Sequence, residues 1–147
     1  GALMLNMDCT HPDLEEFIGV KSDLEKVTSA NISVNVNDEF MESVMENKPF
    51  TQRFHVEATG EDIENVVDSR DLFRKLALNN WKMAEPGILY WDKINSWHLM
   101  SEDPDFEYAG VNPCAEEPLP AFGSCNLASI NLGEFGPSSI KGTKGSM

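Results

Sequence analysis

Hydrophobic residues recur along the chain with two different periods, and the period of two predicts the strands. Ile32, Val34 and Val36 alternate with polar residues over residues 32–37, which indicates a β-strand. Two short apolar runs, at residues 1–9 and 88–91, are typical of buried strands. We therefore expect three strands, one at the start of the chain, one in its first third and one beyond its middle.

Apolar residues three or four positions apart predict helices between these strands. The first helix should begin with Pro12 at its N1 position, preceded by Thr10 or His11 and followed by acidic residues. The second should follow an Asp38 cap and end before Pro49. Its apolar stripe, which we expect in the core, consists of Phe40, Met41, Val44 and Met45.

A third helix is expected after a Ser69 cap, and it should stop at Pro86-Gly87. Its residues at helical spacing are Leu72, Phe73, Leu76, Ala77 and Trp81. Because short strands alternate with amphipathic helices, the pattern predicts an α/β fold with largely parallel strands.

Composition and charge narrow the classes of function. A chain of 147 residues with 41% hydrophobic content is long and apolar enough for one folded domain. Its 25 acidic and 11 basic side chains give a net charge of −14, which disfavours binding to DNA or RNA polymers but not to a single nucleotide. No apolar run approaches the roughly 18 residues of a membrane-spanning helix, so we expect no membrane association.

The two ends of the chain and its cysteines add expectations about context. The chain opens directly on an apolar run and closes on a Gly/Ser/Lys-rich stretch, so we expect a fragment of a larger protein with a flexible tail at 136–147. Three cysteines, without a CxxC pair or a signal peptide, argue against a disulfide framework and favour a reducing cytoplasm. Cys9 lies in an apolar run and is expected to be buried. The dispersed His11, His55 and His98 predict no metal site.

The stretch GVNPCAEEPLPAFGSCNLASINL, residues 110–132, carries the densest candidate chemistry. Its prolines disfavour a helix, and in an extended chain Asn112, Cys114 and Glu116 would project from one face. A proline-rich turn, in which Asn112 hydrogen-bonds its own loop and Glu116 and Glu117 form a solvated acidic pair, fits the spacing equally well. A carboxylate two residues from the thiol disfavours a thiolate and no histidine is near in sequence, so the pattern favours a neutral thiol that gives up a hydrogen atom.

These residues closely resemble the active-site segment of ribonucleotide reductases, and their Asn-Pro-Cys opening most resembles the adenosylcobalamin-dependent class II enzymes. GALMLNMDCTHPDLEEFI, ANISVNVNDEFMESV and EPGILYWDKIN resemble successive segments of the same family, in the same order. The resemblance covers residues 1–135. It implies that they form part of a ten-stranded α/β barrel with a central finger loop.

The resemblance also implies a role for each site residue. Cys114 would become a thiyl radical that abstracts the ribose 3′ hydrogen, Glu116 would take the proton of the 3′ hydroxyl, and Asn112 would hydrogen-bond the sugar hydroxyls. The substrate-binding residues would be Asn112, Pro113, Cys114, Ala115 and Glu116. Cys125 would be one of two redox-active cysteines that reduce the 2′ carbon, and its partner would lie upstream of this chain.

The activity implied is reduction of ribonucleotides, with diphosphates favoured, to deoxyribonucleotides for DNA synthesis. The adenosylcobalamin site would lie mostly outside this chain, which alone should not turn over. The implied partners are nucleoside triphosphate effectors, a thioredoxin-type reductant and a second copy of the parent enzyme in a homodimer. Two alternatives stay open: a class I large subunit with a separate metal-bearing radical subunit, which Pro113 disfavours, and a non-catalytic acidic interaction module.

Overall fold

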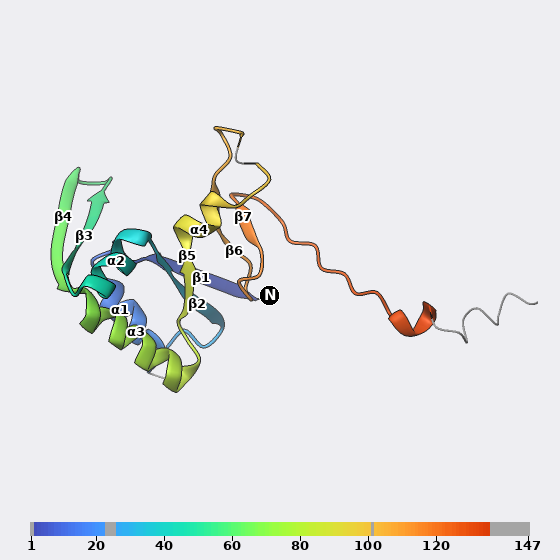
Figure 1. Ribbon diagram of the computed structural model, residues 1–147, viewed down its shortest axis with the longest axis horizontal. Helices are drawn as coiled ribbons and strands as arrows, with labels where there is room; N and C mark the ends of the chain where they lie inside the picture. Colours follow the sequence, from blue (N-terminus) through green and yellow to red (C-terminus); the bar gives the residue numbers. More distant parts are fainter. Residues whose placement is uncertain (1, 23–25, 101, 136–147) are drawn as a thin grey trace, which may run out of the picture.

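Three parallel strands form the central sheet of the molecule (Figure 1). The computed structural model describes residues 2–22, 26–100 and 102–135. The strands are β1 (Leu3–Asp8), β2 (Ala30–Val36) and β5 (Gly87–Tyr90), in the order β1-β2-β5. β2 is the middle strand and pairs in parallel with both neighbours. All three predicted strands, and their parallel arrangement, are confirmed.

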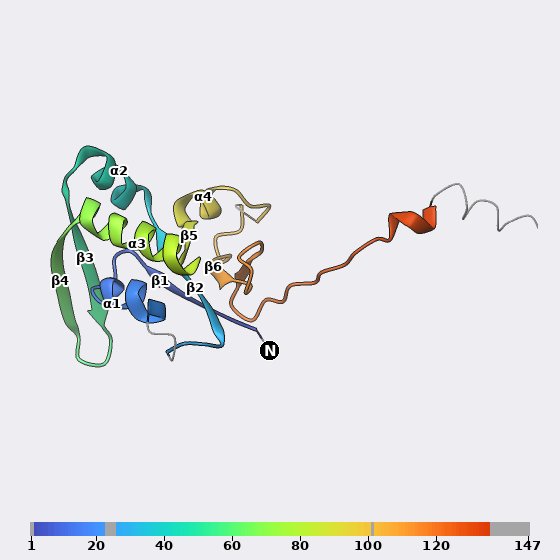
Figure 2. The same ribbon diagram turned by 90° about the horizontal axis from the view of Figure 1, so that it is seen from below.

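Three helices cover one face of this sheet: α1 (Leu14–Gly19), which a short 3₁₀ turn at Val20–Ser22 extends, α2 (Asp38–Glu46) and α3 (Ser69–Met83). Figure 2 shows α1 and α3 side by side, in agreement with the contacts between them. The apolar side chains of β2 meet these helices in one buried cluster. Its members are Cys9, Leu14, Ile18, Val34, Val36, Phe40, Phe50, Leu72 and Leu76.

The opposite face of the sheet is polar, yet its middle strand is buried there too. Ser33 and Asn35 of β2 are 3% and 8% exposed. Asn35 Nδ2 donates to Asp8 Oδ1 at 2.9 Å, and Asn6 Nδ2 donates to Asn35 Oδ1 at 3.4 Å. The alternation in β2 therefore separates an apolar face from a hydrogen-bonded polar face, rather than the core from solvent.

Each predicted helix exists, but each begins at a different residue from the one expected. Asn37, not Asp38, caps α2, because its side chain accepts the N–H of Phe40 at 2.8 Å. Asp68 caps α3, while Ser69 is buried and its hydroxyl donates to a backbone carbonyl. In both cases the residue just before the predicted cap, Asn37 or Asp68, has the extended backbone that a cap requires.

The start of α1 also differs from the prediction. Pro12 precedes the helix rather than occupying its N1 position, and α1 begins at Leu14. His11 forms a turn there, because its Nδ1 accepts the N–H of Asp13 at 3.1 Å and its carbonyl accepts the N–H of Leu14 at 3.1 Å. The turn delays the first helical residue by two positions.

The predicted apolar stripes of α2 and α3 are only partly buried. Phe40, Leu72 and Leu76 lie in the core, but Met45 is 69% exposed and Trp81 is 81% exposed. Ala77 is exposed as well. Helical spacing identified the side of each helix that faces the sheet. The apolar stripes, however, extend to helix residues that no other described element covers.

The hairpin of β3 (Pro49–Val56) and β4 (Glu61–Asp68) was not predicted from the sequence. β4 is exposed along almost its whole length, so its polar and apolar residues show no single buried face. Phe50 attaches the hairpin to the core, and Gln52 Nε2 donates to the carbonyl of His11 at 2.8 Å. The hairpin occupies the end of the molecule opposite β6 and β7 (Figures 1 and 2).

The last third of the chain contains α4 (Trp91–Ser96), a hairpin of β6 (Tyr108–Val111) and β7 (Pro118–Pro120), and a 3₁₀ turn at Leu132–Phe135. In both views the hairpin lies near the amino end of β1 (Figures 1 and 2). The strands in the described residues form three open sheets, so the mixed α/β class is confirmed and a closed barrel is not seen among them. The predicted tail, 136–147, lies outside the described residues, and the boundary at residue 135 stays a prediction. No helix in the described part of the chain has the length and apolar content to cross a membrane.

Candidate functional site

Residues 112–117 form a tight loop that joins β6 to β7. The N–H of Asn112 donates to the carbonyl of Glu117 at 3.1 Å, and Asn112 Oδ1 accepts the N–H of Glu117 at 3.0 Å. The N–H of Ala115 donates to the carbonyl of Asn112 at 2.9 Å. The expected absence of a helix is confirmed. Of the two alternatives left open, the turn is confirmed and the extended backbone is wrong here, because Ala115 has a φ of +65° and reverses the chain.

The loop brings together Asn112, Cys114 and Glu116 without the period-two alternation that we expected. Asn112 is 7% exposed and lies at the base of the loop, whereas Cys114 and Glu116 are exposed. The Oδ1 atom of Asn112 accepts the N–H of Glu117, whereas the Nδ2 atom of Asn112 forms no hydrogen bond among the described residues. The loop therefore presents a thiol and a carboxylate outward, above a buried amide that shapes it.

One hydrogen bond joins this loop to the central sheet. Asn31 Nδ2, near the start of β2, donates to the carbonyl oxygen of Pro113 at 2.6 Å. Sequence reasoning did not include Asn31 among the site residues. Because the two residues are 82 positions apart, no local pattern could have revealed the contact.

Cys125 lies in an extended segment beyond β7. It is partly buried, and Cys114 and Cys125 are both free thiols. This segment runs away from the rest of the molecule in both views (Figures 1 and 2). It exposes five large apolar side chains: Phe122, Leu127, Ile130, Leu132 and Phe135. Cys114 and Cys125 therefore form no disulfide with each other in this structure.

Cys9 is a buried core residue, as the sequence predicted. It is 1% exposed, directly after β1, and belongs to the core cluster. Burial raises the pKa of its thiol to about 11, and a hydrogen bond from the backbone of Asn37 only partly offsets this rise. Cys9 is therefore a neutral core side chain, which separates it from the two cysteines of the candidate site.

The three histidines lie in separate surroundings. His98 packs against Phe106 and Tyr108 beside the β6–β7 hairpin, with each pair of ring centroids 5.1 Å apart. His55 Nδ1 lies 2.7 Å from an oxygen of Asp62, and the His11 ring packs against Phe54 at a tilt of 56°. Within residues 2–22, 26–100 and 102–135, no three His, Cys, Asp or Glu side chains form a group that could hold a metal ion.

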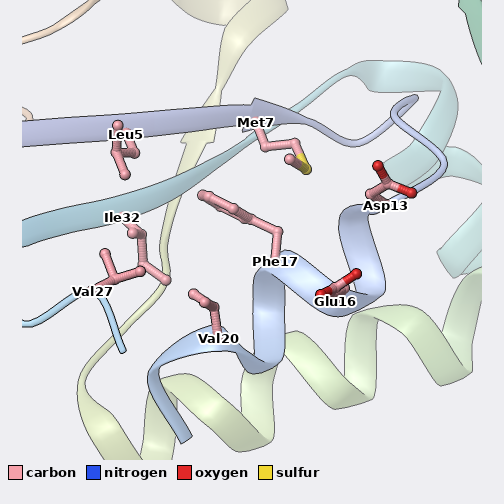
Figure 3. A pocket seen from close by; sticks show the side chains of 8 residues that line it. All are labelled: Leu5, Met7, Asp13, Glu16, Phe17, Val20, Val27 and Ile32. Carbon is pink, nitrogen blue, oxygen red and sulfur yellow. The ribbon is translucent and has the colours of Figure 1, made fainter. Parts of the chain in front are cut away.

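An apolar pocket of about 270 Å³ lies between α1 and the strands β1 and β2 (Figure 3). Figure 3 shows Phe17 projecting from α1 toward the strands, with Asp13 and Glu16 on the α1 side. The other lining residues are Leu5, Met7, Val20, Val27 and Ile32. None of the predicted site residues lines this pocket, so it is distinct from the cysteine loop.

Comparison with known proteins identifies relatives over almost the whole chain. The chain is 41% identical to the vitamin B12-dependent ribonucleotide reductase of Streptomyces clavuligerus, in an alignment that covers 91% of this chain and 16% of the relative. It is 35% identical to the vitamin B12-dependent ribonucleoside-diphosphate reductase of Thermoplasma acidophilum, over 92% of this chain and 17% of the relative. A similarly named enzyme of Mycobacterium tuberculosis strain H37Rv is 32% identical over 90% of this chain and 18% of its own length. The chain thus spans less than a fifth of the length of these relatives.

The family comparison agrees with these relatives. Residues 1–145 match the family described as ribonucleotide reductase, barrel domain. The match extends past residue 135, where the resemblance in the sequence was expected to end. This chain therefore belongs to the ribonucleotide reductase family and corresponds to part of its barrel domain.

Proposed function

We propose that this chain is a part of the catalytic barrel of a ribonucleotide reductase that converts ribonucleoside diphosphates to deoxyribonucleotides for DNA synthesis. The observation that carries the proposal is the loop at 112–117, which exposes Cys114 and Glu116 together and holds Asn112 beneath them. Two relatives that match over most of this chain are named as reductases of ribonucleoside diphosphates, which supports the choice of substrate.

Each residue of the loop has a distinct task in the proposed reaction. The Cys114 sulfur, as a thiyl radical, takes the hydrogen atom from C3′ of the ribose and becomes a thiol, and at the end of the turnover it returns a hydrogen atom to C3′ and is again a thiyl radical. The Glu116 carboxylate accepts the proton of the 3′ hydroxyl, a role that suits an exposed carboxylate within the same short loop. Asn112 Nδ2 remains available to donate a hydrogen bond to a sugar oxygen, because only the Oδ1 of that amide serves the loop. The same loop, with Pro113 and Ala115, forms one wall of the substrate site.

Cys125 supplies reducing equivalents in this proposal. Cys125 and a second cysteine outside this chain each lose one electron and one proton and form a disulfide. The C2′–O bond of the substrate breaks, its oxygen leaves as water, and a C2′–H bond replaces it. A thioredoxin-type reductant then restores the two thiols.

Adenosylcobalamin is the proposed cofactor, because the relatives are named vitamin B12-dependent. When bound, it supplies the radical from which the Cys114 thiyl arises. Among the described residues, the cavity beside the β6–β7 hairpin has a volume of about 430 Å³ and includes the acidic Asp105 and Glu107 in its lining. We place the cofactor contacts mainly outside this chain.

The proposed parent enzyme has further partners that this chain alone does not hold. They are nucleoside triphosphate effectors, a thioredoxin-type reductant and a second copy of the enzyme in a homodimer. Since the chain spans less than a fifth of its relatives, most of the surfaces for these partners belong to other parts of the parent enzyme.

The cofactor proposal is tested with the full-length enzyme that carries this sequence. We expect deoxyribonucleotide formation when adenosylcobalamin is added to the cofactor-free enzyme, and no product without it. Turnover with a separate diiron or dimanganese subunit, in the absence of adenosylcobalamin, would instead establish the class I alternative.

The role of the loop is tested by Cys114→Ser in the same enzyme. We expect nucleotide binding to persist and product formation to disappear, because a serine hydroxyl does not form the required radical under these conditions. Cys9→Ala is the matched control, since it removes a thiol that lies in the core, and it should retain activity in proportion to the folded protein. Undiminished turnover by Cys114→Ser would favour the non-catalytic alternative.

A further inference from the structure

The hydrogen bond from Asn31 to Pro113 acts on the peptide unit that leads into Cys114. The carbonyl oxygen of Pro113 belongs to the planar group that also contains the nitrogen and Cα of Cys114. Asn31 Nδ2 holds that oxygen at 2.6 Å. The Pro113 ring also restricts the φ angle of Pro113, the backbone torsion just before this peptide unit. A contact to this one oxygen therefore restrains the orientation of the whole peptide plane, and with it the direction in which Cys114 leaves the backbone.

The other hydrogen bonds of the loop are internal. Asn112 and Glu117 close its base, and the N–H of Ala115 donates to the carbonyl of Asn112. These contacts fix the shape of the loop, but they do not fix its position relative to the sheet. Among the described residues, the Asn31 amide supplies the hydrogen bond that joins the loop to the sheet.

Asn31 is well placed to serve as a fixed point. It lies near the start of β2, the middle strand of the sheet, where its backbone pairs with Met4 of β1, and pairing with β5 begins two residues later, at Ser33. Because side chains alternate along a strand, Asn31 shares a face with Ser33 and Asn35 and is opposite Ile32 and Val34. The amide therefore projects from the polar face, away from the helices.

We propose that Asn31 is a positioning residue for Cys114, and that its amide sets the distance and direction of the thiol relative to the substrate. The inference rests on the proposed function, because it assigns Asn31 a task in the reaction of Cys114. Hydrogen transfer requires the reacting atoms at close approach, and misplacement by about 1 Å lowers the rate about 100-fold. A residue on a strand of the central sheet, rather than on the loop itself, suits that requirement.

The test uses three substitutions of Asn31 and one control substitution in the full-length enzyme. Asn31→Asp keeps the size of the side chain but removes the donor, and Asn31→Ala removes the donor without adding a charge. Asn31→Gln retains an amide on a longer stem and serves as the conservative variant. Asn95→Asp on α4 is the matched control, because Asn95 is exposed and no hydrogen bond joins it to the loop among the described residues.

Two measurements are made on every variant: kcat and KM for the nucleotide, and hydrogen exchange of the Ala115 amide without substrate. We expect Asn31→Asp and Asn31→Ala to lower kcat about 10- to 100-fold with little change in KM, and to accelerate exchange of that amide. Asn31→Gln should recover part of both properties, and Asn95→Asp should match the wild type.

Either of two results would overturn the proposal: a kcat within twofold of wild type for both donor-free variants, or a lower kcat with unchanged exchange at Ala115. Failure of the proposed function gives a different pattern. An active Cys114→Ser enzyme would refute the role of the thiol, while the exchange measurement would still report whether Asn31 holds the loop.

Discussion

Asn112 and Glu117 close the loop that carries Cys114 through two hydrogen bonds. The backbone N–H of Asn112 donates to the carbonyl of Glu117 at 3.1 Å, and the backbone N–H of Glu117 donates to Oδ1 of Asn112 at 3.0 Å. The second bond makes the Asn112 side chain a structural part of the loop, in addition to the substrate contact proposed for it. The Oδ1 atom of Asn112 therefore closes the loop, while its Nδ2 atom, which forms no hydrogen bond among the described residues, is free for the proposed contact with the substrate.

Asn112→Asp should separate these tasks. The aspartate keeps an oxygen that accepts the Glu117 N–H but lacks the Nδ2 donor, so we expect the loop to persist and turnover to fall at least about tenfold, as for loss of a hydrogen bond worth about 1.4 kcal/mol. Hydrogen exchange at Glu117 and steady-state kinetics of the full-length enzyme measure the two effects. Asn112→Ala removes both groups and should also accelerate the exchange; equal exchange in the two variants would contradict the structural role.

Ala115→Gly should stabilise the loop. Ala115 has a φ of +65°, which costs an L-residue about 1 to 2 kcal/mol, whereas glycine adopts it readily at an entropic cost of about 0.5 to 1 kcal/mol. We expect a net gain of about 0.5 to 1 kcal/mol, visible as slower exchange of the Glu117 amide. Ala121→Gly is the control, because Ala121 is not among the residues with positive φ. Equal effects of the two glycines would show that strain at Ala115 is negligible.

Glu116→Gln should bind substrate and lose most of its turnover. The amide keeps the shape of the carboxylate but accepts no proton, in a step where general base catalysis contributes about 10²- to 10⁴-fold. Equilibrium binding of the nucleotide and kcat, measured on the same preparation, test this expectation. Glu117→Gln is the matched control, since the role of Glu117 in the loop depends on its backbone. Activity of Glu116→Gln within twofold of wild type would assign proton transfer to another group.

Cys125 should appear in a disulfide after one turnover without external reductant, and Cys114 should not. The reduction of one ribose consumes two thiols, and Cys114 must emerge unpaired to carry the next hydrogen atom. Peptide mapping of the full-length enzyme after a single turnover identifies the bonded pair. A dominant bond between Cys114 and Cys125, or one that includes Cys9, would refute the assignment.

Cys9 should resist alkylation in the native enzyme until the pH becomes strongly basic. With its pKa raised from 9.0 to about 11, roughly one Cys9 thiol in a thousand is ionised at pH 8, against roughly one in ten without the shift. Because the folded state favours the protonated thiol, folding stability from this group is lost as the pH rises from about 9 to about 11. Iodoacetamide labelling followed by mass spectrometry measures the reaction, with guanidinium-unfolded protein as the control. Rapid native labelling at pH 8 would contradict the burial of Cys9.

Local sequence was sufficient to predict the strands and helices in which one face packs against the rest of the fold. Ile32, Val34 and Val36 alternate because one face of β2 packs on the helices, and period two follows from strand geometry alone. The same local information was insufficient for helix ends, since Asn37 and Asp38, or Asp68 and Ser69, are adjacent residues that can all act as caps. Only the backbone conformation at each position decides between them. The exposure of Met45 and Trp81 likewise depends on where neighbouring elements stop covering the helices.

The sequence by itself supplied the candidate residues Asn112, Cys114, Glu116 and Cys125, but it did not indicate Asn31. The tertiary structure decided how they are arranged. A positive φ at Ala115 and the closure between Asn112 and Glu117 replaced the expected extended strand by a turn. The contact from Asn31 to Pro113 spans 82 residues and exists because the fold brings β2 beside the hairpin. Spacing along a chain specifies local geometry, whereas a hydrogen bond between distant residues depends on the packing of every element that separates them.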